Sequence, residues 1–453
     1  MKSATGKRQL EQPRLGSGAS VLVACFLAAA IFGVACSSNS SSSSASPAGP
    51  ATISYMTWGG ADGPQKVFGL YQITFPSDST GMSIDVKVGG TNDGEVVNQL
   101  RLMLTAHSTV PDIVQLNYSE VSEFATAGQL LDLKPYISAN LSSMSPSALK
   151  LMQYNGKYVA VANEVKEKLW YYRKDMFAAA GIDPTEVKTQ SDFIAAGKKL
   201  QLKYPKSYIW NLAASQQAYV LGEITSGNGA RISDPSTHQF VVGSDVGIRN
   251  AFQAEAALRA SGVVATKFDD FSPEWQAALA DGTLASVPIA EWFSLFLPQY
   301  APKLAGQWGV TTWPEIGGAT DGAGSEAGGS VFVVPVGAKH AAQALKFLGD
   351  MYMTKTGNLA FWQKFGGVPS VTAAENDPTL AQDPYFGADL IKAYVAAAPT
   401  YKIFPYDPAA IKEITILQSA LATFLGSGSS DPTSALQAAQ QQMTAQIGDP
   451  YKQ

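Results

Sequence analysis

"ATISYMTW" (51–58) alternates apolar and polar side chains as a β-strand does, and "MSIDVKVGG" (82–90) and "PDIVQLN" (111–117) follow it as two further predicted strands. A helical stretch around 64–75 and the amphipathic "GEVVNQLRLMLTAHS" (94–108) lie between them. Strand and helix in alternation at this spacing indicate βαβ units and a mainly parallel sheet. The same pattern recurs less regularly further on and becomes mostly helical over 374–450, so we expect an α/β fold.

Composition bounds the class of protein. The 453 residues are enough for two or three domains, each with its own core. A hydrophobic content of 46% with 15% charged residues is that of a globular protein. The formal net charge is −5, and no dense block of lysine and arginine follows residue 15, which argues against nucleic acid as a partner.

Cysteine and histidine leave little room for metal or thiol chemistry. Both cysteines, Cys25 and Cys36, lie at the N-terminus, so the body of the chain can have no disulfide and no cysteine nucleophile. The three histidines, His107, His238 and His340, do not have the spacing of a zinc site. We therefore expect neither a metal nor another cofactor.

The first 35 residues predict an export signal. Four basic residues within the first 14 precede an apolar run of 15 residues from Val21 to Ala35. A membrane-spanning helix needs about 20 apolar residues. A basic segment followed by a shorter apolar run is typical of a signal peptide.

The end of this signal, "GVAC", resembles the lipobox of bacterial lipoproteins, in which the cysteine becomes the lipid-modified first residue of the mature chain. The match assigns lipidation to Cys36, although Gly33 stands where the usual box has Leu or Val. "LVAC", ending at Cys25, fits the box better, but cleavage there would leave "FLAAAIFGVA" on the mature protein. Ordinary cleavage or an uncleaved anchor are the alternatives.

Residues 36–50 predict a flexible tether. Eight of the ten residues from 37 to 46 are serine, and Pro47 and Pro50 follow, so the segment has nothing apolar to bury. A coil of this length has a typical reach of about 20 Å. We expect an exported protein held by lipid at the outer face of the bacterial cytoplasmic membrane.

Four segments further along share an order with a known family. They are "VPDIVQLNYSEVSEFATAGQLLDLKPYI" (110–137), "YNGKYVAVANEVKEKLWYYRKDMFAAAGID" (154–183), "FSPEWQAALADGTLASVPIAEW" (271–292) and "AGGSVFVVPVGAKHAAQALKFLGDM" (327–351). Together they resemble the bacterial extracellular solute-binding proteins of family 1, which include maltose-binding-protein-like receptors. The resemblance extends from residue 51 to about 370. The chain departs from it at Arg173, where the family often has Asn, and at "NEVKEK" (163–168), where a proline-rich approach is usual.

The resemblance implies a two-lobed periplasmic-binding-protein (clamshell) fold in which each lobe is a mainly parallel sheet flanked by helices. The crossing segments would lie near Val161–Val165, Thr311–Glu315 and Val368–Val371. Lobe one would be 51–161 plus 315–368, and lobe two 162–314 plus 369–453. It also implies a monomer that captures one carbohydrate and delivers it to the membrane permease subunits of an ABC importer.

Candidate ligand-binding residues follow from where such folds bind. Ligands lie beyond the carboxyl ends of strands in open α/β sheets and in clefts between domains. Aromatic rings stack on the apolar faces of sugars, and Asp, Asn, Glu and backbone N–H groups pair with hydroxyls. The candidates at strand ends and crossings are Trp58, Gly60, Asn92, Asp93, Asn117, Tyr118, Glu164, Trp210, Asn211, Trp292, Gly329, Ser330, Phe404 and Tyr406.

Each candidate also has a structural interpretation. Core packing is the alternative for the tryptophans. Turn formation or helix capping is the alternative for Asp93, Asn117 and Tyr118. Glu164 could belong to a solvated charge cluster with the neighbouring lysines, and Gly329 and Ser330 could simply begin a strand.

A secreted carbohydrate-active hydrolase and a surface adhesin or receptor ectodomain are the rival classes. The G-x-S-x-G pentapeptide of serine hydrolases and the P-loop pattern do not occur in the sequence. Asp269 and Asp270 could be named as a glycosidase pair, but neighbouring residues on an extended chain point to opposite faces. The sequence therefore favours a binding protein that is not an enzyme.

Overall fold

The computed structural model describes residues 50–162, 165, 167–213, 225–319 and 329–452. The predicted signal peptide, Cys25, Cys36, all of the tether except Pro50, and Glu164 lie outside the described residues.

The first sheet contains the three strands predicted from residues 51–117. Its order is β2-β1-β3-β14-β6, with β1 parallel to β2 and β3, and β14 antiparallel to β3 and β6. The bounds are β1 (Ala51–Trp58), β2 (Met82–Gly90), β3 (Ile113–Asn117), β6 (Ala160–Ala162) and β14 (Ser330–Val333). The three predicted strands are confirmed to within two residues. The buried Asp112 carboxylate fixes the start of β3 beside β1, because it accepts the Ser54 N–H and hydroxyl at 2.8 and 2.7 Å.

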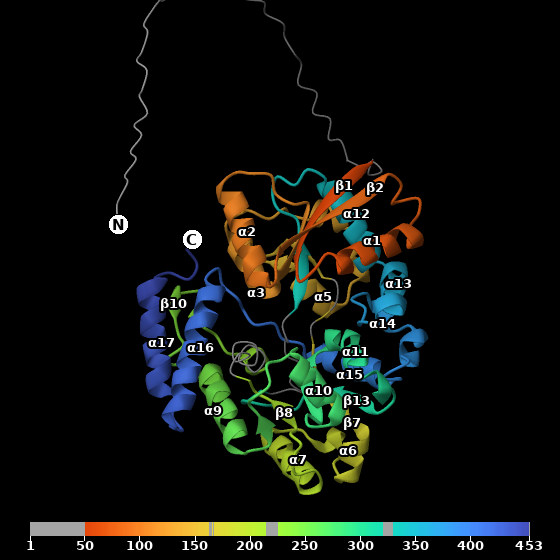
Figure 1. The fold of residues 1–453 in the computed structure, drawn as a ribbon. Coiled ribbons are helices and arrows are strands. Elements are labelled where there is room, and N and C mark those ends of the chain that lie inside the picture. The colour runs from red at the N-terminus through yellow and green to blue at the C-terminus, as the bar shows by residue number, and fades with distance from the viewer. Residues whose placement is uncertain (1–49, 163–164, 166, 214–224, 320–328, 453) are drawn as a thin grey trace, which may run out of the picture. The chain divides into compact units, whose positions relative to one another are not determined.

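Helices cover the first sheet on both faces and at its edges. They are α1 (Asp62–Thr74), α2 (Asp93–Thr105), α3 (Tyr118–Thr126), α4 (Lys134–Ile137), α5 (Pro146–Leu151), α12 (Ala341–Tyr352) and α13 (Lys355–Phe365). Helix α2 contacts β1, β2 and β3, and α12 contacts β1 and β6. Figure 1 shows α1, α2 and α12 around β1 and β2. A hairpin of β4 (Gln153–Tyr154) and β5 (Lys157–Tyr158) turns at Asn155 and Gly156, both with positive φ.

The second sheet is centred on β7. Strands β12 and β13 flank it, both antiparallel to it. Parallel pairing of β8 with β11, and of Tyr208 with Leu284, extends the sheet on the β12 side. The bounds are β7 (Lys168–Arg173), β8 (Trp210–Asn211), β11 (Val264–Ala265), β12 (Ser286–Ala290) and β13 (Trp308–Thr312).

The expectation of mainly parallel sheets needs one refinement. Among the described strands, the first sheet has β14 running against its neighbours, and the second sheet has β7 doing so. Each of these strands follows a segment that arrives from the other sheet. A strand entered in this way begins at the edge where the parallel strands end, so its direction is reversed.

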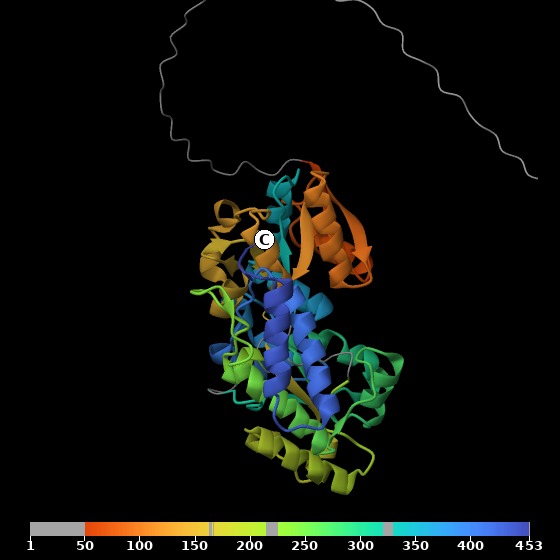
Figure 2. The ribbon, with the colours of Figure 1, turned by 90° about the vertical axis from the view of Figure 1, so that its left-hand side faces the viewer.

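Helices and short helical turns surround the second sheet. The α-helices are α6 (Lys174–Ala179), α7 (Gln190–Lys203), α9 (Val246–Ala260), α10 (Pro273–Asp281), α11 (Leu297–Tyr300), α14 (Thr372–Glu375), α15 (Asp389–Ala397), α16 (Ala410–Ser427) and α17 (Thr433–Gln446). Figures 1 and 2 show α16 and α17 lying side by side, and the two helices contact each other. The mostly helical C-terminal part is confirmed.

Strand β7 separates two apolar cores. Leu169 and Tyr171 pack into the core that extends to the first sheet, whereas Trp170 packs into a second core with α7, α9 and α16. All three side chains are fully buried. Both faces of β7 are therefore covered, which explains its near-continuous apolar sequence. Within the described ranges, no helix combines the length and the apolar character needed to cross a membrane.

Candidate functional site

Five strands of the first sheet meet at one edge. Strands β1, β2 and β3 end there at Trp58, Gly90 and Asn117, and β14 begins there at Ser330, which pairs with Asn117. Strand β6 ends beside the start of β14, at Ala162. We call this the first edge. It is the place where α/β sheets present ligand-binding groups.

The second sheet has a corresponding edge. Strand β12 ends at Ala290 opposite Lys168, the first residue of β7, and β13 ends opposite Leu169. Strands β8 and β11 end there together, at Asn211 and Ala265. We call this the second edge.

A short segment ties the two edges to each other. Strand β6 ends at Ala162 on the first edge and β7 begins at Lys168 on the second. Six residue steps of fully extended chain span about 20 Å at most. The two edges are therefore no more than about 20 Å apart where this segment joins them.

The first edge carries a network of polar side chains around Asn117. Its Nδ2 donates to the Asp93 carboxylate, and its backbone N–H donates to Glu120 Oε2 at 2.8 Å. Burial, and then the Asp93 carboxylate, raise the pKa of Glu120 well above its usual range. The structure thus brings the predicted residues Asp93 and Asn117 into contact and adds Glu120, whose role as partner of Asn117 was not predicted.

Gln115 links three strands just inside this edge. Its Oε1 accepts hydrogen bonds from the Thr57 and Tyr55 hydroxyls at 2.7 and 3.3 Å, and its Nε2 donates to Ser330 Oγ at 2.8 Å. The predicted pair Gly329 and Ser330 does begin β14, and the Gly329 carbonyl accepts the Tyr118 N–H at 3.2 Å. Sequence reasoning missed Gln115 because a glutamine inside a strand carries no distinctive signal.

Trp58 and the loop after it form the outer part of the first edge. The Trp58 side chain is partly buried against the core. Gly59 and Gly60 are exposed with φ of 76° and 155°, and a Cβ on either would meet open space. Asn92 is exposed and caps α2, with its side chain accepting the Glu95 N–H at 3.1 Å. Asn92, predicted as a ligand-binding residue, thus serves as a helix cap, and its Nδ2 donates to the Thr91 hydroxyl at 3.4 Å.

The second edge carries aromatic rings. Trp292 follows the end of β12 in the 3-10 helix η4 (Glu291–Leu295), so the strand stops two residues before the predicted tryptophan. Its ring centroid lies 6.0 Å from that of Phe271 and 5.9 Å from that of Phe296. Phe271 and Phe296 are 40% and 37% exposed, which is unusual for large apolar side chains. We call Phe271, Trp292 and Phe296 the aromatic cluster.

Phe271 has an unusual backbone conformation that its neighbours hold in place. Its φ is 67°, in the left-handed region that bulky residues rarely adopt. The turn is held because Ser272 caps α10, accepting the Trp275 N–H, and because Gln276 donates to the Phe271 carbonyl at 2.8 Å. Strain of this kind clusters at ligand-binding sites. Sequence reasoning missed Phe271 and Phe296 because nothing local distinguishes them from core phenylalanines.

Asn211 holds the loop that precedes Phe271 by hydrogen bonds. Its Nδ2 donates to the Phe268 carbonyl at 2.8 Å and to Asp270 Oδ1 at 2.7 Å, while its Oδ1 is buried and has no hydrogen-bond partner among the residues that the structure describes. Trp210, its neighbour, is 3% exposed and packs edge-on against Phe193 and Trp313. The core interpretation of Trp210 therefore fits the structure better than a ligand-facing one.

A buried lysine lies beneath the second edge. The Nζ of Lys168 lies 4.8 Å from the centroid of the Trp210 ring and 4.3 Å from that of Trp313. The side chain is fully buried, so these cation–π contacts form in a desolvated setting where they are strongest. They fix the start of β7, directly after the segment that joins the two edges.

A second segment, from Tyr401 to Glu413, also joins elements of the two sheets. Tyr406 packs edge-on against Tyr118 with centroids 6.2 Å apart, and the Ser122 hydroxyl donates to the Asp407 carbonyl at 2.8 Å. Tyr406 is partly exposed beside the first edge, whereas Phe404 is buried in the second core. Tyr406 therefore lies beside Tyr118 at the first edge, whereas Phe404 packs behind it, with ring centroids 5.0 Å apart.

Glu167 is the one residue of the joining segment whose carboxylate is fully buried without a hydrogen-bond partner among the described residues. Burial is the main cause that raises its pKa to about 9; the Glu375 carboxylate raises it further and Lys150 lowers it. Its carbonyl accepts the Glu291 N–H at 3.1 Å. At neutral pH this side chain is protonated and uncharged.

Among the residues with described positions, no group of three or more His, Cys, Asp or Glu side chains is arranged to hold a metal ion. The first edge instead carries amide, hydroxyl and carboxyl groups that hydrogen-bond to one another. The second edge carries aromatic rings. The arrangement suits a neutral polar ligand with apolar faces.

The family of bacterial extracellular solute-binding proteins matches residues 75–388. The chain belongs to this family. An arabinooligosaccharide-binding protein of Bacillus subtilis (strain 168) is 24% identical over 282 residues. Those residues are 61% of this chain and 64% of that protein, a little under two-thirds of its length. A lactose-binding protein of Rhizobium radiobacter is 25% identical over 294 residues, which cover 62% of this chain and 67% of that protein.

Solved structures show the fold. The binding protein associated with an ABC transporter of B. animalis subsp. lactis Bl-04, in complex with β-1,6-galactobiose, has a TM-score of 0.72 at 21% identity. The alignment covers 88% of this chain and 97% of that one. The predicted two-lobed α/β class is thereby confirmed.

Proposed function

We propose that this protein captures a carbohydrate between the first and second edges and delivers it to an ABC importer. The observation that carries the proposal is the pairing of a polar edge with an aromatic one, no more than about 20 Å apart at the segment that joins them. A pyranose or furanose offers hydroxyls around its rim and C–H groups on its faces, and it needs both kinds of partner.

The first edge supplies the hydroxyl partners. Asp93, Asn117 and Gln115 already bond one another or the neighbouring strands, so their free donor and acceptor positions are held in fixed directions. A preorganised site of this kind discriminates between sugars, because a wrong hydroxyl pattern leaves buried groups unpaired. Trp58 and Tyr118 border the same edge.

The second edge supplies the stacking surface. Phe271 and Trp292 lie with an interplanar angle of 32°, and Phe296 stands nearly perpendicular to Trp292 at 89°. Exposed rings lose water when a sugar face covers them, and burial of that apolar area provides most of the binding free energy. Asn211 keeps the loop that presents Phe271 in place.

The cellular setting follows from the family and the N-terminus. Family members act outside the cytoplasm, as the family description states. Export by residues 1–35, lipidation of Cys36 and the serine-rich tether would keep a monomeric receptor near its permease in the membrane. The protein acts in this proposal by binding and release, without catalysis.

A thermal-shift screen against a sugar library tests the proposal. Arabino-oligosaccharides, lactose and β-1,6-galactobiose head the library, because the relatives' names mention these sugars. A matching sugar raises the melting temperature by mass action, by an amount that grows with its concentration. If no carbohydrate shifts the transition at millimolar concentration while another polar solute does, the sugar assignment is wrong.

A further inference from the structure

A cavity of about 160 Å³ lies within the first-sheet part of the protein, between α1, the strands β1, β3 and β14, and the helices α12 and α13. Five aromatic rings line it: Tyr55, Phe332, Phe347, Tyr352 and Phe361. None of the five was a predicted site residue, and the function proposed above does not use them.

The lining is too apolar for a sugar ring. Gln115 provides the amide group of the wall, and that amide already accepts two hydrogen bonds and donates one, to groups of β1 and β14. The Tyr55 hydroxyl is used in one of these bonds. A sugar would bury more hydroxyls here than the remaining N–H of Gln115 and the Tyr352 hydroxyl can pair, at a cost of about 1–3 kcal/mol for each unpaired group.

The size of the cavity suits an aromatic ring. An engineered apolar cavity of about 150 Å³ in another protein binds benzene. Edge-on ring contacts are already the rule in this wall, since Tyr55 and Phe332 meet at 83° with centroids 5.9 Å apart. A phenyl group would add contacts of the same kind.

The mouth of the cavity lies beside the first edge. The lining residues that are partly exposed are Pro64, Val67, Gln115 and Phe361, whereas the remainder of the lining is buried. Gln115 belongs to both the cavity and the first edge through its bond to Ser330. Pro64 stands in the first turn of α1, which begins only four residues after Trp58. A substituent on a sugar at the first edge can therefore enter the cavity.

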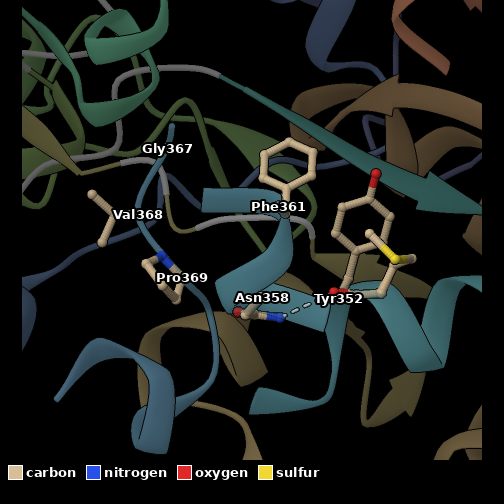
Figure 3. Close-up of a pocket in the computed structure, with 7 residues that line it drawn as sticks. Tyr352, Asn358, Phe361, Gly367, Val368 and Pro369 are labelled. Atoms are coloured by element: carbon tan, nitrogen blue, oxygen red, sulfur yellow. Dashed lines mark hydrogen bonds between the residues drawn. The ribbon is translucent and has the colours of Figure 1, made fainter. Parts of the chain in front are cut away.

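The far wall is held in place by its neighbours. Tyr352 and Phe361, with centroids 5.8 Å apart, also border a second, water-sized cavity of about 10 Å³ (Figure 3). There Asn358 donates to the Met351 carbonyl at 3.3 Å and accepts the Ser370 N–H at 2.8 Å. These bonds tie α12, α13 and the chain after α13 together, so the aromatic wall is preformed and does not have to be ordered by a ligand.

We infer that this aromatic cavity binds the apolar aglycone of a glycoside whose sugar is held at the first edge. The inference rests on the proposed carbohydrate binding and extends it to a substrate class, namely glycosides with an aryl or similarly compact apolar substituent. The sugar is recognised by polar groups of the edge, and the substituent by the five rings.

Paired probes test the inference on the complete protein. Isothermal titration compares phenyl and methyl β-D-galactopyranoside, and phenyl and methyl α-L-arabinofuranoside. Burying the phenyl ring is expected to tighten binding by about 10- to 100-fold over the methyl glycoside of the same sugar. In the variant Val67→Phe, whose new ring fills the cavity, the phenyl-to-methyl affinity ratio should fall to about one. The matched control Ile73→Phe lies on the same helix but 80% exposed, and it should keep the wild-type ratio.

A probe that needs no sugar keeps the test decisive. The ¹⁹F signal of 4-fluorophenol should broaden or shift with the wild-type protein and with Ile73→Phe, and not with Val67→Phe. If the methyl glycosides bind and the phenyl glycosides bind no more tightly, the inference is overturned, whereas carbohydrate binding still stands. Failure of every glycoside would count against carbohydrate binding, and 4-fluorophenol would then decide on the cavity alone. If it binds wild type and Val67→Phe equally, or neither, the cavity does not bind an aryl group.

Discussion

In the proposed mode of binding, the first and second edges recognise different parts of the sugar. At the first edge, amide, hydroxyl and carboxyl groups from three strands and two helix starts bond one another, and their exposed positions are few and fixed. At the second edge, partly exposed rings lie close together, and the polar groups, such as those of Asn211, are buried beneath them. If both edges contact the sugar as proposed, the first edge would set specificity, because hydrogen bonds are directional, and the second would set affinity, because burial of apolar area is not.

The largest expected effect comes from removing the centre of the aromatic edge. Trp292→Ala should weaken sugar binding by about 100-fold and abolish most of the ligand-induced rise in melting temperature, because the stacking surface loses its central ring. Titration calorimetry measures the loss. Tyr136→Ala removes an exposed ring outside both edges and serves as the control. Equal affinities for Trp292→Ala and wild type would remove the second edge from the site.

The next largest effect is a pH dependence of folding stability, caused by Glu167 in the segment between the edges. The folded-state pKa of Glu167 is about 9, against an ordinary value of 4.5. Between these values the folded protein keeps a proton that the unfolded chain releases, so stability is full below about pH 4.5 and falls as pH rises toward 9. The slope from this group is about 1.4 kcal/mol per pH unit. Glu167→Gln should flatten that decline, measured by urea unfolding at pH 6, 7 and 8.

The groups facing Glu167 are Glu375, which raises its pKa, and Lys150, which lowers it. Glu375→Gln should therefore lower the pH at which the decline due to Glu167 ends, whereas Glu167→Gln removes that decline. Parallel stability–pH curves for wild type and Glu167→Gln would show that the carboxyl group is not protonated in the folded protein.

A smaller effect is expected for Asn117 at the first edge, where a variant can distinguish helix capping from sugar binding. Asn117→Ala should lower stability by about 1 kcal/mol through loss of its capping box, and it should also weaken sugar binding by about 10-fold. Thr189→Ala breaks the corresponding capping box of α7, in which the Thr189 hydroxyl bonds Asp192 of the same turn, and should cost similar stability without changing affinity. If both variants bind equally well, Asn117 is only a helix cap.

The smallest effect concerns the strained backbone beneath the aromatic cluster. Phe271→Gly and Phe271→Ala both remove the ring, but only glycine adopts φ of 67° without penalty. The glycine variant should therefore be more stable than the alanine variant by about 1 kcal/mol, as read from chemical denaturation. No difference between them would mean that the left-handed conformation relaxes once the ring is gone.

Sequence alone was enough for the parts of the molecule in which local pattern and tertiary structure agree. Strand β1 has the predicted bounds because its alternation of apolar and polar residues is that of a strand and because it pairs with β2 along its whole length. Asp93, Asn117, Gly329 and Ser330 could be grouped because strand ends of a parallel sheet share an edge.

The remaining features depend on contacts that no local pattern records. Trp210 and Phe404 are buried because both faces of the second sheet are covered. The sequence does not show whether such an aromatic side chain packs into a core or faces a ligand. Phe271 is exposed only because Asn211, Ser272 and Gln276 hold its turn. Gln115 links three strands that are far apart in the sequence, so no local pattern could identify it.

Titration calorimetry of the purified protein with arabino-oligosaccharides, lactose and β-1,6-galactobiose tests carbohydrate capture most directly. We predict that at least one of these sugars binds with one site per chain, and that its affinity falls in both Trp292→Ala and Asn117→Ala. Absence of binding heat for every sugar at millimolar concentration, or binding that neither variant changes, would contradict a carbohydrate site built from the two edges.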